Sequence, residues 1–334
     1  MNARLIMLLK VTSSVALIIL LFFRVDPQNV WDALRHTDLS LLLIGMLFYL
    51  GAIASNAVKW GVLLRAQGVQ APLGSLVRHT FVGVFFNNFL PFIGADMIRG
   101  YGMVREVSNT ADVAVSVVVD RLVGLLVFAT AGTLSAVVAV RFVGIDEPAL
   151  VVVEQMGLLL TGGLLLAFLL LLSGRLRRLV ERVVARVPGL APLEPIVTKL
   201  SAAVGSYRSR PGALLTAYGV GLTTILLANI VNWLLFVSIG STVPMLLLFV
   251  FIFNPIIGLT MALPISISGL GVNQHIFPFL YGLVGVAENP AIAASLLLQL
   301  TIALTSLPGG LIWAAGRTQV AERSVPPAPQ PSDR

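Results

Sequence analysis

Long apolar segments alternate with short polar connections along most of this chain. A bilayer core about 30 Å thick needs about 20 apolar residues to cross it as a helix. Six segments reach that length, at residues 5–23, 39–64, 112–140, 150–173, 212–239 and 290–316. Because their apolar runs are continuous, they favour helices over the alternating strands of a membrane β-barrel. The pattern predicts an all-α polytopic membrane protein with six full transmembrane helices.

Two further apolar regions, residues 73–101 and 243–285, are interrupted by proline, glycine, asparagine and charged residues. Backbone that leaves the helix at membrane depth is tolerated only where protein or a water-filled cavity lines it. We therefore predict that both regions are re-entrant helical hairpins, which return to the side from which they entered. The residues expected to break the helices are Pro91, Gly94, Pro264, Gly269 and Gly271.

The basic residues indicate the orientation of these segments. The loop over residues 174–211 holds eight Lys and Arg against two Glu, so the positive-inside rule places it in the cytoplasm. Acidic residues at least balance basic ones in residues 24–38 and 141–148, which suits the outside. With two returning hairpins, six spans put both termini in the cytoplasm. Lys59 and Trp60, near the cytoplasmic end of the second span, are expected to be an interfacial anchor rather than a substrate contact.

The two halves of the chain, about residues 1–140 and 150–316, have the same order of segments but enter the membrane from opposite faces. Each half has a Leu-Pro break followed by a glycine-bearing turn. This arrangement is typical of the inverted-topology repeats of transporters. Because the residue-level similarity is weak, the sequence leaves the repeat open. We expect one membrane domain over residues 1–317 and a Pro-rich, disordered cytoplasmic tail over residues 318–334.

The composition supports a membrane protein and excludes several kinds of chemistry. Hydrophobic residues make up 57% of the chain and charged residues 11%, against about 25% charged residues in soluble domains. Cysteine is absent, which excludes disulfides and thiolate ligands. The net charge of +7 reflects the loop bias rather than nucleic-acid binding. The three histidines are not spaced as metal ligands, and nucleotide-binding and hydrolase motifs are missing, so we expect no cofactor and no metal.

The first broken region carries the first group of candidate binding residues: Asn87, Asn88, Asp96 and Arg99. Asp96 and Arg99 are three residues apart and share one face of a helix. Two interpretations stay open. The pair neutralises itself and has a structural role, or Arg99 and nearby helix ends bind an anionic headgroup, since both bind phosphate well. The buried position of a basic residue beside a helix break favours binding.

Asp120 and Arg121 interrupt the third span and are further candidates. Neighbouring helical residues do not face each other, so each of these two needs its own partner. We expect Arg99 or Arg105 to pair with Asp120, which leaves Arg121 for Asp96 or for a ligand. A purely structural ion-pair network explains these residues equally well.

In the second broken region hydroxyl and amide groups replace the charges. The candidates there are Ser266, Ser268, Asn273 and Gln274. They either line a site for headgroup hydroxyls or satisfy backbone groups at the tip of the hairpin, and the sequence leaves both open.

Four stretches of the chain together resemble the flippase-like transmembrane domain of the lysylphosphatidylglycerol synthase superfamily. The stretches are Lys59-Trp60, FFNNFLPFIGADMIRGY at residues 85–101, Asp120-Arg121 with Gly124, and LPISISGLGVNQ at residues 263–274. The resemblance implies a lipid-moving membrane domain. The positions that match the family's pattern are Asn88, Pro91, Gly94, Asp96, Arg99, Pro264, Gly269 and Gly271. Relatives often carry Arg-Glu where this chain has Asn273-Gln274, which puts a charge-pair role there in doubt.

We therefore expect a lipid translocase of the cytoplasmic membrane that moves a polar or anionic headgroup of a phospholipid, glycolipid or polyprenyl-linked lipid. Only a short tail follows the last span, so we expect no synthase activity. The main alternative is a non-transporting scaffold or accessory subunit for a lipid-modifying enzyme. A third is an intramembrane enzyme with Asp96 or Asp120 as base. A homodimer and a lipid-synthesis enzyme as partner both stay open.

Overall fold

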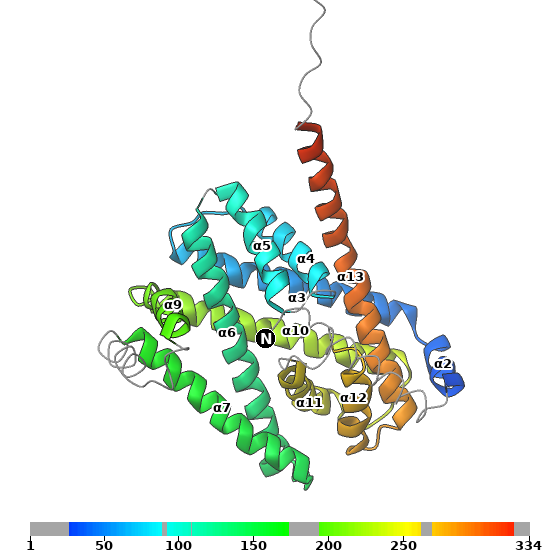
Figure 1. Ribbon diagram of the computed structural model, residues 1–334. Helices are drawn as coiled ribbons and strands as arrows, with labels where there is room; N and C mark the ends of the chain where they lie inside the picture. The colour runs from blue at the N-terminus through cyan, green and yellow to red at the C-terminus, as the bar shows by residue number, and fades with distance from the viewer. Residues whose placement is uncertain (1–26, 89–91, 108, 174–193, 262–268, 324–334) are drawn as a thin grey trace, which may run out of the picture.

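The computed structural model describes residues 27–88, 92–107, 109–173, 194–261 and 269–323, and all regular secondary structure in these ranges is helical (Figure 1). The long helices are α3 (Leu39–Ala66), α6 (Thr110–Val137) with a π-helical turn η1 (Val138–Phe142), α7 (Pro148–Leu172), α10 (Pro211–Ser238) and α13 (Glu288–Arg323). The shorter helices are α2 (Pro27–Arg35), α4 (Leu73–Asn87), α5 (Phe92–Val107), α9 (Glu194–Gly205), α11 (Leu246–Met261) and α12 (Val272–Gly282).

Five helices of the described part are long and apolar enough to span a membrane: Leu39–Ala66, Thr110–Phe142, Pro148–Leu170, Pro211–Ser238 and Glu288–Ala315. They coincide with five of the six predicted spans. The remaining prediction, residues 5–23, lies outside the described residues. The prediction of an all-helical, multi-pass membrane protein is thus confirmed at this level.

Each broken region folds as two short helices that pack on each other, α4 on α5 and α11 on α12. These helices have 15, 16, 16 and 11 residues. At about 1.5 Å per residue, none of them reaches the roughly 30 Å of the bilayer core. Pro91 and Pro264 lie outside the described residues. Gly269 and Gly271 precede α12 with φ of +77° and +82°, a left-handed conformation that favours glycine.

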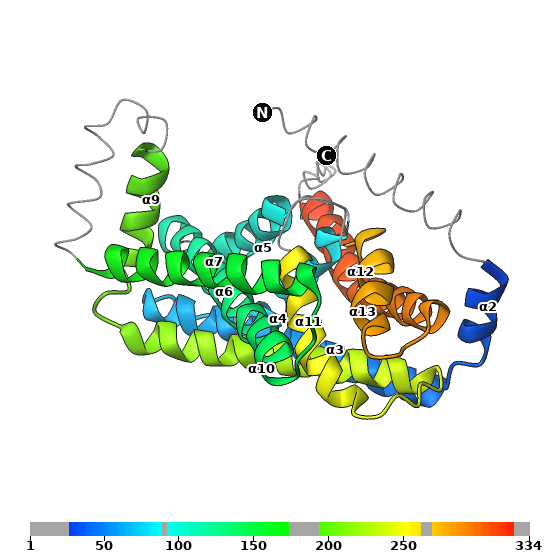
Figure 2. The ribbon, with the colours of Figure 1, turned by 90° about the horizontal axis from the view of Figure 1, so that it is seen from below.

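The helices of the two halves interlock. α3 and α10 lie side by side and form the most extensive contact of the molecule (Figure 2). α4 of the first half packs on α13 of the second half, and α11 of the second half packs on α6 of the first. A Cβ at Gly309 would collide with the backbone carbonyl of Phe81, and one at Gly132 would lie 2.9 Å from the carbonyl oxygen of Pro255. Both crossings therefore need glycine.

Aromatic rings fill the space between α10, α11 and α12. The ring centroid of Tyr281 lies 4.3 Å from that of Phe236 and 5.4 Å from that of Phe253, and Phe277 stacks on Phe236 at 6.1 Å. All four side chains are fully buried. This aromatic cluster packs the C-terminal part of α12 against α10 and α11.

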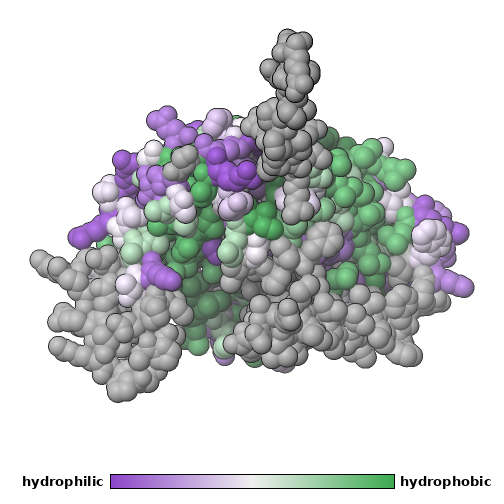
Figure 3. Space-filling model, turned by 45° about the horizontal axis from the view of Figure 1, so that its top comes forward, coloured by the Kyte–Doolittle hydropathy of each residue, from purple (hydrophilic) through white to green (hydrophobic). Residues whose placement is uncertain are grey.

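The surface matches a protein that lies in a bilayer. In the face seen in Figure 3, hydrophobic residues form a broad area to the right of the centre, and hydrophilic residues gather at the upper left and at the right edge. α13 continues to Arg323, so residues 318–323, expected in the disordered tail, are helical. The reason is local, because this segment contains neither glycine nor proline and the first proline follows at Pro326.

Candidate functional site

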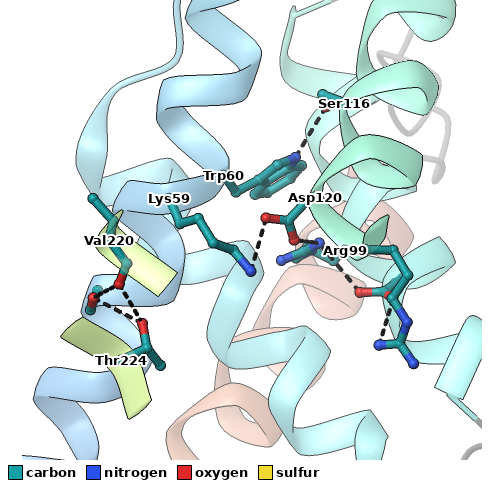
Figure 4. A network of polar contacts seen from close by, with 10 residues as sticks. Lys59, Trp60, Arg99, Ser116, Asp120, Val220 and Thr224 are labelled. Atoms are coloured by element: carbon teal, nitrogen blue, oxygen red, sulfur yellow. Dashed lines mark hydrogen bonds and ion pairs between the residues drawn. The ribbon is translucent and has the colours of Figure 1, made fainter. Parts of the chain in front are cut away.

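Five charged side chains from three helices meet inside the apolar part of the molecule (Figure 4). α3 contributes one of them, α5 two and α6 two. We call this group the charge cluster, and it consists of Lys59, Asp96, Arg99, Asp120 and Arg121. The sequence analysis singled out four of its five members as candidate binding residues.

Asp120 is the centre of the charge cluster. Its Oδ1 lies 3.2 Å from Lys59 Nζ, and its Oδ2 accepts a hydrogen bond of 2.9 Å from Arg99 Nη2. The prediction that Arg99 pairs with Asp120 is confirmed. The other predicted partner, Arg105, is exposed and lies near Tyr101 instead. Its Cζ atom is 6.0 Å from the centroid of the tyrosine ring.

Asp96 joins the two guanidinium groups of the charge cluster. Its Oδ1 lies 3.3 Å from Arg99 Nη2, one helical turn along α5, and its Oδ2 lies 3.5 Å from Arg121 Nη1 on α6. Asp120 and Arg121 thus have different partners, as neighbours on a helix must. The expected contact of Arg121 with Asp96 is present.

Trp60 supports the charge cluster from one side. The Cζ atom of Arg99 lies 4.4 Å from the centroid of its ring, and its Nε1 donates a hydrogen bond of 3.1 Å to Ser116 Oγ. A guanidinium over an indole face is an attractive cation–π arrangement. The prediction that Lys59 and Trp60 form an interfacial anchor is wrong. Their exposed fractions are 8% and 0%, because Lys59 reaches inward to Asp120 instead of outward to water.

The charge cluster lies between helices of which two, α3 and α6, are long and apolar enough to span a membrane. Lys59 stands seven residues before the end of α3, and Asp120 ten residues after the start of α6. These offsets correspond to about 10 Å and about 15 Å along the helix axes. Within a membrane-spanning helix, ionised side chains are costly unless they are paired.

The charges do not cancel. Among the described residues and their contacts, three cations and two carboxylates give the charge cluster a net charge of +1. Asp120 has a cation at each of its oxygens and is buried, whereas the side chains of Asp96 and Arg121 are 24% and 37% exposed. The accessible edge is therefore the Asp96–Arg121 pair. A cationic site with a partly exposed guanidinium is suited to a phosphate or another oxyanion.

The other predicted binding residues lie away from these contacts. Asn88 Nδ2 donates a hydrogen bond of 2.9 Å to Ser306 Oγ of α13, and Asn87 is exposed at the end of α4. Asn273 and Gln274 are buried in the first turn of α12. Ser266 and Ser268 lie outside the described residues.

A chain of amides between α10 and α11, two of them buried, was not predicted from the sequence. Asn254 Nδ2 donates a hydrogen bond of 2.6 Å to Asn229 Oδ1, and Asn232 Nδ2 donates one of 3.1 Å to Asn254 Oδ1. The sequence does contain a signal for this chain of amides. Two asparagines stand three residues apart in an apolar span, and a third precedes Pro255. Polar groups at such depth are expected to find partners of this kind.

A second buried acid, unlike Asp120, was not predicted from the sequence. Glu154 of α7 is buried and accepts a hydrogen bond of 2.8 Å from Arg141 Nε in the π-helical turn η1. In the described parts of the chain, His, Asp and Glu form no group of three or more that could hold a metal ion.

A known family matches nearly the whole of the chain that carries this arrangement. The family model described as "Lysylphosphatidylglycerol synthase TM region" matches residues 7–309. The matched range includes the whole charge cluster, both broken regions and the buried amides. No curated protein matches the chain.

Proposed function

We propose, from the premise that this chain belongs to the family of the lysylphosphatidylglycerol synthase TM region, that it moves an anionic lipid headgroup across the membrane. The family indicates a membrane protein related to lipid handling. The step from lipid handling to translocation depends on the charge cluster.

The excess of positive charge among the described residues of the charge cluster is the observation that carries the proposal. A purely structural network would be most stable with equal numbers of cations and anions, because an extra buried charge is costly in hydrocarbon. In the described part of the chain, the contacts of the charge cluster join three cations to two carboxylates. A phosphate that enters beside Arg121 would balance this charge, and the lipid chains would stay in the bilayer.

Binding of phosphate also offers a way to couple the ligand to movement. The contacts of Asp96 and Asp120 with Arg99 and Arg121 include two that tie α5 to α6. A phosphate competes with Asp96 for Arg121, since arginine binds both groups in the same bidentate way. The exchange would loosen α5 from α6 and let the hairpin of α4 and α5 shift.

The helix contacts support an inverted repeat with two re-entrant hairpins. If α3 corresponds to α10, α4 to α11 and α6 to α13, then the packing of α4 on α13 is the counterpart of the packing of α11 on α6. The sequences at the starts of the second half-helices also align. Gly94, Asp96 and Arg99 correspond in spacing to Gly269, Gly271 and Gln274. Such repeats allow a site near the midplane to open alternately to each side.

The test is headgroup movement in vesicles that contain the full chain. Arg121→Gln removes the exposed guanidinium and is expected to slow the movement of an acyl-labelled anionic phospholipid by about tenfold, the effect of one lost charged hydrogen bond. Arg105→Gln is the matched control, because it removes an exposed arginine outside the charge cluster. Movement that is unchanged in Arg121→Gln would refute the proposed site.

The same vesicles separate the alternatives. A scaffold or accessory subunit moves no lipid faster than protein-free vesicles do. An intramembrane enzyme changes the mass of the recovered lipid. Movement with the lipid mass unchanged supports the translocase.

A further inference from the structure

Glu154 and Arg141 form an ion pair at the end of α6 that lies away from the charge cluster. Glu154 of α7 is 3% exposed, and its Oε1 accepts a hydrogen bond of 2.8 Å from Arg141 Nε. Arg141 belongs to η1, and its side chain is 62% exposed. The pair therefore combines a carboxylate that is closed to water with a guanidinium that is largely open to it.

The carboxylate of Glu154 keeps one open atom. A carboxylate can accept several hydrogen bonds at its two oxygens. Within the part of the chain that the structure describes, Glu154 Oε2 is buried and has no hydrogen-bond partner. A buried ionised carboxylate is costly unless it is paired, so the negative charge of Glu154 depends on Arg141.

The helices that enclose Glu154 carry no other described charge near it. The rest of α7 contains no Asp, Glu, Lys or Arg. On α6 the nearest charged residue before η1 is Arg121, which stands 20 residues before Arg141. This separation is about 30 Å along the helix axis. Arg141 is thus the one described cation within reach of the carboxylate.

The neighbouring segments add no second cation there. The loop between η1 and α7 carries Asp146 and Glu147, which are acidic like Glu154 itself. α9 carries Glu194 and Lys199, but it packs at the far end of α7, around Leu172. If Arg141 leaves, the described residues therefore offer nothing that balances the charge of Glu154.

Arg141 reaches Glu154 from a π-helical turn. The N–H of Val143 donates to Val138 O at 2.9 Å, a spacing of five residues instead of the four of an α-helix. Single π turns within α-helices are frequent at functional sites. A change of this turn to α-helical geometry would rotate Arg141 around the helix axis and break its contact with Glu154.

We propose that Glu154 is a proton-binding site, at which a proton replaces Arg141 as the partner of the carboxylate. The proton comes from water on the side that the loop of residues 143–147 faces, which the positive-inside rule predicts to be the outside. It forms an O–H bond with a carboxylate oxygen, while Arg141 keeps its charge and turns out to water. The buried site is neutral before and after the exchange.

This inference goes beyond the proposed function, because it names a second ligand and a source of energy for lipid movement. The two ends of α6 lie beside α7 at the bottom of Figure 1 and beside α5 at the top. Glu154 holds the first end through Arg141, and the charge cluster ties the second end to α5. Proton binding would release the first contact and so bias the position of α6 at the second.

The protonated carboxyl can be detected by its reaction with dicyclohexylcarbodiimide, which modifies protonated carboxyl groups in apolar surroundings. The purified full chain is treated at several pH values, and mass spectrometry identifies the modified residues. Modification of Glu154 is expected to increase as the pH falls. In Arg141→Gln it is expected to be about tenfold faster at neutral pH, the effect of one lost charged hydrogen bond.

Three further variants serve as controls. Glu154→Gln should remove the modification, which assigns it to this residue. Arg141→Lys keeps a positive charge beside the carboxylate, so its rate of modification should stay near the native rate. Asp146→Asn removes an exposed acid from the same end of α7 and should leave the modification unchanged. The unfolding temperature shows whether each variant is folded.

The coupling to lipid movement is measured in vesicles with a pH difference across the membrane. The native chain is expected to move a labelled anionic phospholipid faster when the side that faces residues 143–147 is acidic. Glu154→Gln resembles the protonated form at every pH, so it is expected to lose this dependence on the pH difference. Asp146→Asn is expected to keep it.

The outcomes separate the proton site from the proposed translocation. If Glu154 is not modified at any pH at which the native chain is folded, the inference is overturned, since a purely structural ion pair stays ionised and closed. Lipid movement that responds to the pH difference equally in the native chain and in Glu154→Gln also overturns it. Modification of Glu154 in a chain that moves no lipid supports the proton site and refutes only the proposed translocation.

Discussion

At the scale of single residues, Asp120 has the largest structural role in the charge cluster. It is buried and holds Lys59 at one oxygen and Arg99 at the other. Loss of one partner of a buried ion pair leaves an uncompensated charge, which costs far more than the intact pair contributes. Here a single substitution would strand two cations.

Asp120→Asn is therefore expected to lower the free energy of unfolding by about 3 kcal/mol or more. Asp96→Asn is the matched comparison. It should cost clearly less, because Asp96 is partly exposed and water can solvate the cations it releases. Unfolding of the purified variants in detergent, followed by circular dichroism, measures the difference. Equal stability of the two variants would contradict the central role of Asp120.

The sequence could predict only part of the charge cluster, because the longer a side chain is, the more places it can extend to. Asp120 and Arg121 interrupt a continuous apolar span, so their need for separate partners follows from helix geometry alone. Lys59 could not be placed in this way. Its long side chain can extend to the membrane surface or turn inward, and only the positions of α5 and α6 decide between the two. The amides of α10 and α11 were missed because uncharged residues disturb an apolar pattern less.

At the scale of elements, two helix crossings hold the halves together through glycine. Gly309 lets α13 approach the backbone of α4, and Gly132 lets α6 approach the backbone of α11. Close approach through small residues is a common way for membrane helices to associate. The sequence predicted the helices but not their partners, because the crossings join elements that are far apart along the chain.

Gly309→Leu is expected to destabilise the protein by about 2 kcal/mol or to prevent folding, since the new side chain collides with the backbone at Phe81. Gly163→Leu on α7 is the control, because a side chain there meets open space. The yield of monodisperse protein and its unfolding temperature report the effect. A folded Gly309→Leu variant with native stability would contradict the close crossing.

At the scale of the whole molecule, the proposed cycle requires α5 and α6 to separate while α3 and α10 stay together. The charge cluster spans the first of these contacts and the extensive helix pair forms the second. Because the chain contains no cysteine, introduced pairs can be cross-linked without interference.

Gly100→Cys with Val117→Cys would join α5 to α6, since a Cβ at Gly100 lies 3.2 Å from Val117 Cγ2. Oxidation of this pair is expected to stop headgroup movement, and reduction should restore it. Gly45→Cys with Leu234→Cys is the control between α3 and α10, where the Cβ separation of 3.9 Å suits a disulfide. Full activity of the oxidised α5–α6 pair would rule out this opening.

The indole of Trp60 lies against the guanidinium of Arg99, so a spectroscopic label on this ring would report the position of that side chain. The chain has four tryptophans, and Trp60 is fully buried with a guanidinium against its face. A fluorine atom on that ring would resonate at a frequency set by the cation above it. A lipid that draws Arg99 away from this ring would shift the fluorine resonance, so the labelled protein would report the binding of the lipid.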